Sequence, residues 1–355
     1  MKIAFLNDTH CGARNSSDIF IDYQEKFYES VFFPYLIQNG IMHIIHLGDY
    51  YDNRKYINFK ALNANRRHFL EPLVAHGMTM DIIPGNHDVF YKTTNDLNSL
   101  SELLGGFSKH INIITSPTEI VYDSMKIALI PWISPQNYSE TMEFLKDTDA
   151  KWVGAHLELQ GFEVMRGVTQ SVGMDPSIFK RFDRVLTGHF HTKSQRGGIQ
   201  YLGSQFEFTW ADVDDPKYFH VLDTDTGEIT EVRNPITLFS KIVYNDEIRD
   251  YKKFDVSDLS GKFVKVVVAS KTNPKMFESF IERVSDADIH ELKISETFSE
   301  FLGDNVDMSE SMEMVEDTPQ LLKSYVDSVE TDLDKQRLKT ELHTLYVEAM
   351  NTEII

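Results

Sequence analysis

The chain has 355 residues, of which 41% are hydrophobic and 25% are charged. This composition is typical of a globular protein and excludes a disordered, collagen-like or coiled-coil chain. The length exceeds that of one small domain and fits one large core with one or two smaller units. No apolar stretch approaches the roughly 18–20 residues that a membrane-spanning helix needs.

The net charge is −20, from 55 acidic and 35 basic residues. A protein that binds nucleic acid by bulk electrostatics is usually basic. If this chain handles DNA or RNA, bound metal ions, a basic patch or a basic partner must offset its charge locally. The excess is uneven, since residues 301–355 hold 13 acidic and 4 basic residues.

Cys11 is the single cysteine, so the chain can form no internal disulfide. The N-terminal residues become acidic at Asp8, too early for a secretory signal peptide. We therefore expect the chain in the cytoplasm.

The first 235 residues alternate short apolar runs with stretches of helical character. The segments 22–36 and 59–75 have apolar residues at helical spacing. The apolar runs are rich in Ile, Val and Leu, which predicts an α/β fold with strands buried on both faces. These runs are 2–7, 42–47, 80–84, 111–114, 126–131, 152–155 and 184–187, and from residue 199 the pattern favours hairpins at 199–203, 218–223 and 228–232.

Asn234 and Pro235 mark a plausible domain boundary. Beyond it, strands at 262–270 and 289–297 flank a helix at 274–284, for which Asn273 is the candidate cap. An acidic, Met-rich stretch follows, and then two segments with apolar stripes predict a helical pair that needs a docking surface. The predicted organisation is a core at 1–235, a second domain at 236–302, a linker at 303–317 and a helical segment at 318–355.

Five blocks of polar residues each follow an apolar run, where a predicted strand ends. In open α/β sheets, sites form at the carboxyl edge of the strands. The side chains are carboxylates, an amide and imidazoles, which are metal-ligand types. The blocks are Asp8-Thr9-His10, Gly48-Asp49, Gly85-Asn86-His87-Asp88, His156 and Gly188-His189-Phe190-His191.

The spacing of these residues allows two metal ions. Asp8 and His10 are two positions apart and project to the same side of an extended chain, and Asp49 has two oxygens that can bridge two ions. Carboxylates with imidazoles suit Mn²⁺, Fe²⁺ or Zn²⁺, whereas the cysteine count excludes an all-thiolate zinc site. One ion could take Asp8, His10, Asp49 and His191, and the other Asp49, Asn86, His156 and His189.

Two metal ions about 3.5–4 Å apart can activate a bridging water and clamp a phosphoryl group during in-line displacement. His87 directly follows the amide ligand and would face the substrate as an acid.

The five blocks, in this order and spacing, resemble the motif set of the calcineurin-like metallophosphoesterases. Within that superfamily, the segments 182–191 and 201–204 are similar to the SbcD-type nucleases of double-strand break repair, and most of all to the recombination endonuclease subunits of bacteriophages. The resemblance implies a metallophosphoesterase β-sandwich flanked by helices, with a small α/β capping domain and a C-terminal helical pair.

The resemblance also implies a two-manganese nuclease that degrades duplex DNA from 3′ ends and nicks single strands, in recombination and repair. It implies a homodimer and an ABC-type ATPase partner of the SbcC kind, held by the helical pair. One position departs from the pattern: some members have a second histidine soon after the Gly-Asp motif, where this chain has Asp52. The role of that histidine does not carry over.

Each candidate also has a plain structural reading. Asp8, Asp49 and Asn86 could be turn formers, His156 a buried core histidine, and His87 a hydrogen-bonding neighbour. The aromatic stretch 206–210 favours core packing over base stacking. Arg14, Arg54 and Lys55 could contact phosphates or lie in solvent. The other histidines fit no block and are expected to be structural or exposed, such as His43, His46, His68, His76, His110, His220 and His343.

Two other functions remain open on the sequence. The same metal chemistry could act on small-molecule phosphodiesters or phosphoproteins. Alternatively, the core could be a scaffold for the ATPase with purely structural metals, which the complete ligand set disfavours.

Overall fold

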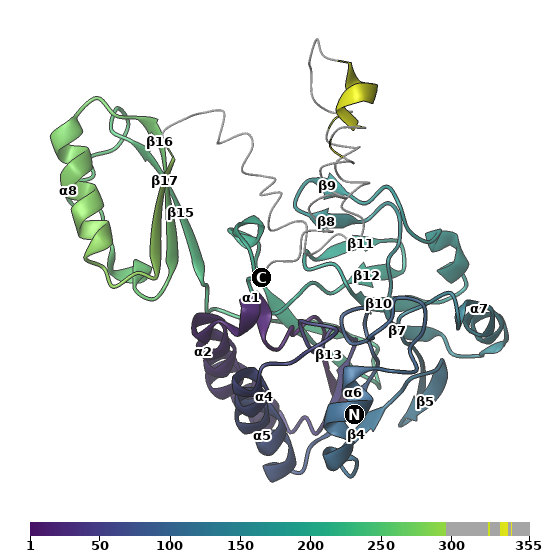
Figure 1. Ribbon diagram of the computed structural model, residues 1–355. Helices are drawn as coiled ribbons and strands as arrows, with labels where there is room; N and C mark the ends of the chain where they lie inside the picture. Colours follow the sequence, from purple (N-terminus) through teal and green to yellow (C-terminus); the bar gives the residue numbers. More distant parts are fainter. Residues whose placement is uncertain (296–325, 327–333, 340–341, 343–355) are drawn as a thin grey trace. The chain divides into compact units, whose positions relative to one another are not determined.

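The computed structural model describes residues 1–295, 326, 334–339 and 342 (Figure 1). The chain divides into two compact units, Met1–Ile294 and Ser295–Ile355. The predicted linker 303–317 lies outside the described residues, as does most of the predicted helical segment 318–355. Within that segment, residues 335–339 are helical and the Asp334 carboxylate accepts the backbone N–H of Gln336 at 2.9 Å.

The first of two six-stranded sheets carries the N-terminal strand at its centre. Its order is β14-β13-β1-β2-β3-β4. The strands from β1 to β4 are parallel, whereas β13 is antiparallel to both β1 and β14. The bounds are β1 Lys2–Leu6, β2 His43–His46, β3 Thr79–Ile82, β4 Ile111–Ile113, β13 Tyr218–Asp223 and β14 Ile229–Arg233.

The second six-stranded sheet has the order β11-β12-β10-β7-β6-β5. Its four inner strands are parallel, and β11 and β5 pair antiparallel at the two edges. The bounds are β5 Thr118–Tyr122, β6 Met125–Ile130, β7 Trp152–His156, β10 Arg184–Gly188, β11 Ser194–Arg196 and β12 Ile199–Tyr201. A small ribbon pairs β8, Glu163–Met165, with β9, Val168–Thr169.

The two sheets share an apolar core. Phe5 and Ile45 from the first sheet join Leu129 and Leu186 from the second, and all four are buried. Separate apolar clusters cover the outer face of each sheet, where the helices pack. The predicted α/β sandwich with flanking helices is confirmed.

Helices cover the outer face of the first sheet, and the helix Tyr138–Asp147 packs on the second (Figure 1). Among the described residues, no helix has the length and apolar character needed to cross a bilayer. The bounds are α1 Ala13–Ser16, α2 Asp18–Phe27, α3 Phe33–Gln38, α4 Phe59–Asn65, α5 Glu71–Ala75, α6 Ser99–Leu104 and α7 Tyr138–Asp147, with short 3₁₀ turns at Gly105–Phe107, Pro176–Phe179, Trp210–Asp212 and Ser257–Leu259.

Two helices contain a widened turn that the sequence pattern did not predict. The π segments Tyr28–Phe32 and Arg66–Leu70 each lie directly before a helix whose second residue is a proline, Pro34 or Pro72. A proline inside a helix donates no N–H and crowds the carbonyl four residues earlier, and a wider turn relieves that crowding.

A third sheet follows the sandwich. It has the order β15-β16-β17, and β15 pairs in parallel with β16. The bounds are β15 Phe239–Asn245, β16 Phe263–Ser270, β17 Glu291–Ser295 and α8 Pro274–Ser285. The Asn273 side chain accepts the N–H of Met276 at 3.2 Å and caps α8, as predicted. The sequence pattern missed β15.

Candidate metal centre

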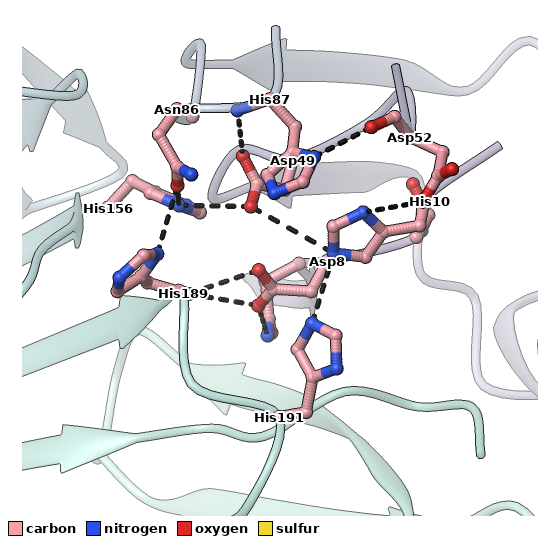
Figure 2. A network of polar contacts seen from close by, with 12 residues as sticks. Asp8, His10, Asp49, Asp52, Asn86, His87, His156, His189 and His191 are labelled. Carbon is pink, nitrogen blue, oxygen red and sulfur yellow. Dashed lines mark hydrogen bonds and ion pairs between the residues drawn. The ribbon is translucent and has the colours of Figure 1, made fainter. Parts of the chain in front are cut away.

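All eight predicted site residues meet in one place. They lie at or just beyond the carboxyl ends of β1, β2 and β3 in the first sheet and of β7 and β10 in the second. Figure 2 shows their side chains turned toward one another between the two sheets. The eight are Asp8, His10, Asp49, Asn86, His87, His156, His189 and His191; all are buried except His87, which is half-buried.

The first ligand group joins Asp8, His10 and His191. One potential ligand atom from each lies within 4.8 Å of the others. The Nε2 atoms of His10 and His191 are 3.0 Å apart. Two imidazole nitrogens that face each other across so short a gap are arranged as ligands of one ion would be.

The second ligand group joins Asp49, His156 and His189, again within 4.8 Å. The Oδ2 atom of Asp49 lies 3.3 Å from Nε2 of His156 and 3.9 Å from Nε2 of His10. This oxygen therefore lies between the two groups, where a bridging carboxylate is needed.

Asn86 completes the second group. Its Oδ1 atom lies 2.9 Å from Nε2 of His156 and 2.9 Å from Nδ1 of His189. The Nδ1 atom of His156 lies 2.7 Å from the carbonyl of Leu47, which can only accept, so the proton of that ring is on Nδ1 and Nε2 is turned toward the site.

Backbone hydrogen bonds continue past the strand ends and hold the first two blocks together. The N–H of Asp8 donates to the carbonyl of Gly48 at 2.9 Å, and the N–H of His10 donates to that of Asp49 at 3.1 Å. The third block is joined to the second by Asp88, whose buried carboxylate accepts the N–H groups of Tyr50, Tyr51 and Gly85. The motif contained Asp88, but its role was not predicted.

Four of the predicted ligands have positive φ angles, which non-glycine residues seldom adopt. The values are 46° for Asp8, 43° for His10, 53° for Asp49 and 93° for His189. Backbone conformations of this kind cost about 1–3 kcal/mol each and gather where function requires them. The sharp turns carry each ligand inward directly after its strand.

The two carboxylates have opposite pKa shifts. Burial is the largest effect on each and raises the pKa of Asp8 above its usual range. For Asp49, the positive charges of His156 and then His87 outweigh burial and hold the pKa well below its usual range. Asp49 is therefore ionised at neutral pH although it is 2% exposed.

The imidazoles also divide into two kinds. Burial and the neighbouring His156 lower the pKa of His189 to about 3, and burial with His10 holds that of His191 well below its usual range. These two rings are neutral at physiological pH, which is the form that binds metals. Burial acts against the charged forms of His10 and His156 too, but Asp52 and Asp49 at His10, and Asp49 at His156, raise both pKa values to about 9.

The donor set fits divalent metal ions. Oxygen and nitrogen atoms converge in the site, and the buried Nδ1 of His191 has no hydrogen-bond partner. Mixed carboxylate, amide and imidazole donors suit Mn²⁺, Fe²⁺ or Zn²⁺. Binding would also compensate the two buried carboxylates, which are costly to leave unpaired.

His87 lies beside both ligand groups but is only half-buried. Its N–H donates to Oδ1 of Asp49 at 2.8 Å, and its ring contacts that of His10 edge-on with centroids 4.9 Å apart. Its Nδ1 lies 2.6 Å from the carbonyl of Asp52, which can only accept, so Nδ1 carries a proton.

Three residues near the site were not predicted. The Phe208 ring packs on His10 and His191, with centroids 5.3 and 5.2 Å away, so this part of the aromatic stretch 206–210 is packing, as favoured. Trp132 packs on His189 at 5.5 Å. The buried Lys217 donates to the carbonyl of His191 at 3.0 Å. The sequence offered only a weak indication of these residues, namely that each is an aromatic residue or a lysine close to an apolar strand.

The calcineurin-like phosphoesterase model matches residues 1–193, which include all five blocks. The chain is 31% identical over 358 residues to exonuclease subunit 1 of Enterobacteria phage T4, across 98% of this chain and 99% of that protein. The chain belongs to the calcineurin-like phosphoesterases. The expected resemblance to phage nuclease subunits is thereby confirmed, since this phosphoesterase has a full-length homologue of that kind.

A solved structure described as a novel archaeal phosphodiesterase also aligns with this phosphoesterase. It covers 66% of this chain and 100% of its own, at 14% identity and with a TM-score of 0.35.

Proposed function

We propose that this phosphoesterase is a two-metal-dependent DNA nuclease, which degrades duplex DNA from 3′ ends and cuts single-stranded DNA. The observation that carries the proposal is the convergence of five distant sequence blocks on one buried set of donors. The full-length similarity to a protein named exonuclease subunit 1 supports DNA as the substrate.

The contacts favour a division of the ligands between two ions, with Asp49 shared. Asp8, His10 and His191 would hold one ion, and Asn86, His156 and His189 the other. We propose Mn²⁺ for both, with Fe²⁺ as the alternative that uses the same donors. When bound, the two ions would supply an activated water and charge neutralisation at the phosphoryl group.

The chain's own side chains then orient the reaction. The Leu47 carbonyl accepts the Nδ1 proton of His156 and fixes its ring, so that Nε2 faces the site. Phe208 and Trp132 close the sides of the imidazole cluster and exclude water from them.

We assign His87 the role of general acid. Its half-buried ring lies at the rim of the ligand cluster, and the Asp52 carbonyl holds its Nδ1 proton. The imidazolium form would then donate the Nε2 proton to the oxygen that leaves when the P–O bond breaks.

The remaining parts of the proposal concern assembly. We propose that the chain acts in the cytoplasm of the host cell as one subunit of a complex on DNA, which the name of the phage relative supports. Residues 236–302 would form the capping domain, and residues 303–317 a linker. Residues 318–355 would bind the coiled coil of an SbcC-type ABC ATPase, and the nuclease would form a homodimer.

The test is cleavage of end-labelled linear duplex and single-stranded DNA by the purified protein, with Mn²⁺ or with EDTA. The matched variant is Asp49→Asn, which keeps the shape of the bridging side chain and removes its charge. We expect Mn²⁺-dependent cleavage by the wild type and none by the variant, with unchanged thermal unfolding in EDTA.

A chromogenic phosphodiester in parallel reactions separates the alternatives. Hydrolysis of this ester with no cleavage of DNA, also when an ABC-type ATPase partner is present, would contradict DNA as the substrate while the metal centre stands. Equal DNA cleavage by the wild type and Asp49→Asn would overturn the proposed centre itself.

A further inference from the structure

We propose that Asp52 is a positioning residue that holds the predicted ligand His10 through its carboxylate and the predicted acid His87 through its backbone carbonyl. The inference rests on the proposed function, because both histidines take their roles from it.

The position of Asp52 is fixed by the backbone. Its N–H donates to the carbonyl of Cys11 at 3.1 Å, and Cys11 and Tyr51 form an isolated parallel bridge. These bonds extend the pairing of β1 with β2 beyond the strand ends, so that Asp52 lies directly behind His10.

The carboxylate of Asp52 faces the far side of the His10 ring (Figure 2). Its Oδ1 lies 3.5 Å from Nδ1 of His10, while Nε2 of the same ring faces His191 at 3.0 Å. A carboxylate behind a ligating imidazole keeps the proton on the rear nitrogen, leaves the lone pair on the front nitrogen and strengthens it as a ligand.

The backbone carbonyl of Asp52 orients the ring of His87 in a similar way. It accepts the Nδ1 proton of His87 at 2.6 Å, and the rings of His87 and His10 meet edge-on at 88°. One residue therefore sets the ring orientation of both histidines. The two effects are separable, because a substitution removes the carboxylate and leaves the carbonyl in place.

The side chain of Asp52 is 29% exposed, whereas that of His10 is 5% exposed. Replacing the carboxylate therefore opens no closed core cavity, and the fold should survive. This makes metal affinity a cleaner measurement than stability for this position.

The experiment measures Mn²⁺ binding without DNA, by calorimetry and by the electron paramagnetic resonance of free Mn²⁺. It compares the full-length wild type with Asp52→Ala and Asp52→Asn. The control is Asp183→Asn. Asp183 is exposed and directly precedes β10, whereas His189 and His191 follow the opposite end of that strand. The substitution removes one negative charge outside the site.

We expect Asp52→Ala to weaken one of the two Mn²⁺ sites by roughly 10–100-fold and to leave the other unchanged. Asp52→Asn retains an acceptor oxygen and should fall between Ala and the wild type, and Asp183→Asn should bind as the wild type does. Because the carbonyl still holds His87, DNA cleavage by both Asp52 variants should return to the wild-type rate at saturating Mn²⁺.

Equal Mn²⁺ affinity in the wild type and both Asp52 variants would overturn the inference. A cleavage defect that saturating Mn²⁺ does not restore would also overturn it, since the carboxylate would then act on the reaction rather than on His10. If the wild type bound no Mn²⁺, the proposed metal centre would fail and the inference with it. Mn²⁺ binding without DNA cleavage would count against the proposed substrate only, and the affinities would still decide the role of Asp52.

Discussion

Gly85 approaches Asp49 so closely that a Cβ atom at position 85 would overlap Oδ1 of the carboxylate. The same Cβ would lie 2.8 Å from Cε1 of His156, closer than real Cβ atoms come to their neighbours. The loop after β3 can therefore reach the bridging carboxylate only because residue 85 has no side chain.

Gly85→Ala should displace Asp49 and His156 together. We expect kcat/KM for DNA to fall by about 100-fold or more, because shifts of about 1 Å in a catalytic group have effects of that size. The control is Gly105→Ala, where an added Cβ meets nothing within 4 Å and φ is −55°. Steady-state kinetics of both variants check the prediction, and equal activities would contradict it.

His87→Gln should slow DNA cleavage while Mn²⁺ binding stays unchanged, since His87 is not among the proposed ligands. A general acid contributes about 10²–10⁴-fold when the leaving oxygen is a poor leaving group. A nitrophenolate needs no such proton, so hydrolysis of bis(p-nitrophenyl) phosphate should fall far less. Rates measured in parallel on the two substrates test this prediction. An equal loss of rate on both would show that His87 is not the general acid.

Lys217→Met should lower the free energy of unfolding and weaken the first ligand group. The buried ammonium pairs with Asp212 and Asp215 and holds the carbonyl of His191, so its loss leaves the buried Asp212 carboxylate without its positive partner. Breaking such a pair costs about 3–5 kcal/mol.

Denaturant unfolding in EDTA measures this loss. The matched control is Lys126→Met, because Lys126 also pairs with two acids, Glu119 and Asp149, but is 41% exposed. A surface pair of that kind contributes at most about 1 kcal/mol. Similar losses in the two variants would show that the buried network has no special role.

His220 should make the fold sensitive to mild acid. Burial lowers its folded pKa to about 4 from a usual 6.5, and neither ring nitrogen has a hydrogen-bond partner. As the pH falls below 6.5, the unfolded chain takes up a proton that the folded chain refuses until about pH 4, so stability declines over that window.

When the pH falls from about 7.5 to about 5.5, we therefore expect the free energy of unfolding of His220→Phe to drop by about 1 kcal/mol less than that of the wild type. Urea unfolding in EDTA at the two pH values gives the difference, with His76→Gln at an exposed histidine as the control. The same pH dependence in the wild type and His220→Phe would exclude His220 as its source.

Much of the site could be predicted because its residues follow apolar strands directly. Asp8, Asp49 and His189 come at the ends of β1, β2 and β10, and parallel strands bring their carboxyl ends to one edge. The backbone of such a strand fixes the positions of the next one or two residues. The order of residues along the chain was therefore enough to predict that these side chains lie at the site.

Other residues carried only a weak local signal. Phe208 and Lys217 reach the site from loops whose course depends on how the two sheets pack, which no short pattern encodes. The strand β15 was missed because only three of its seven residues are buried, at irregular spacing. The role of Asp52 depends on a backbone carbonyl, which is the same in every residue.

The carboxylate of Asp8 accepts the N–H of His189 at 3.0 and 3.1 Å, across a separation of 181 residues. During translation, a chain that has emerged only through β7 has neither this contact nor the imidazoles of His189 and His191. Contacts so distant along the chain form late in folding. A product that terminates before β10 would therefore be inert, so such an incomplete chain could not act as an unregulated nuclease inside the cell.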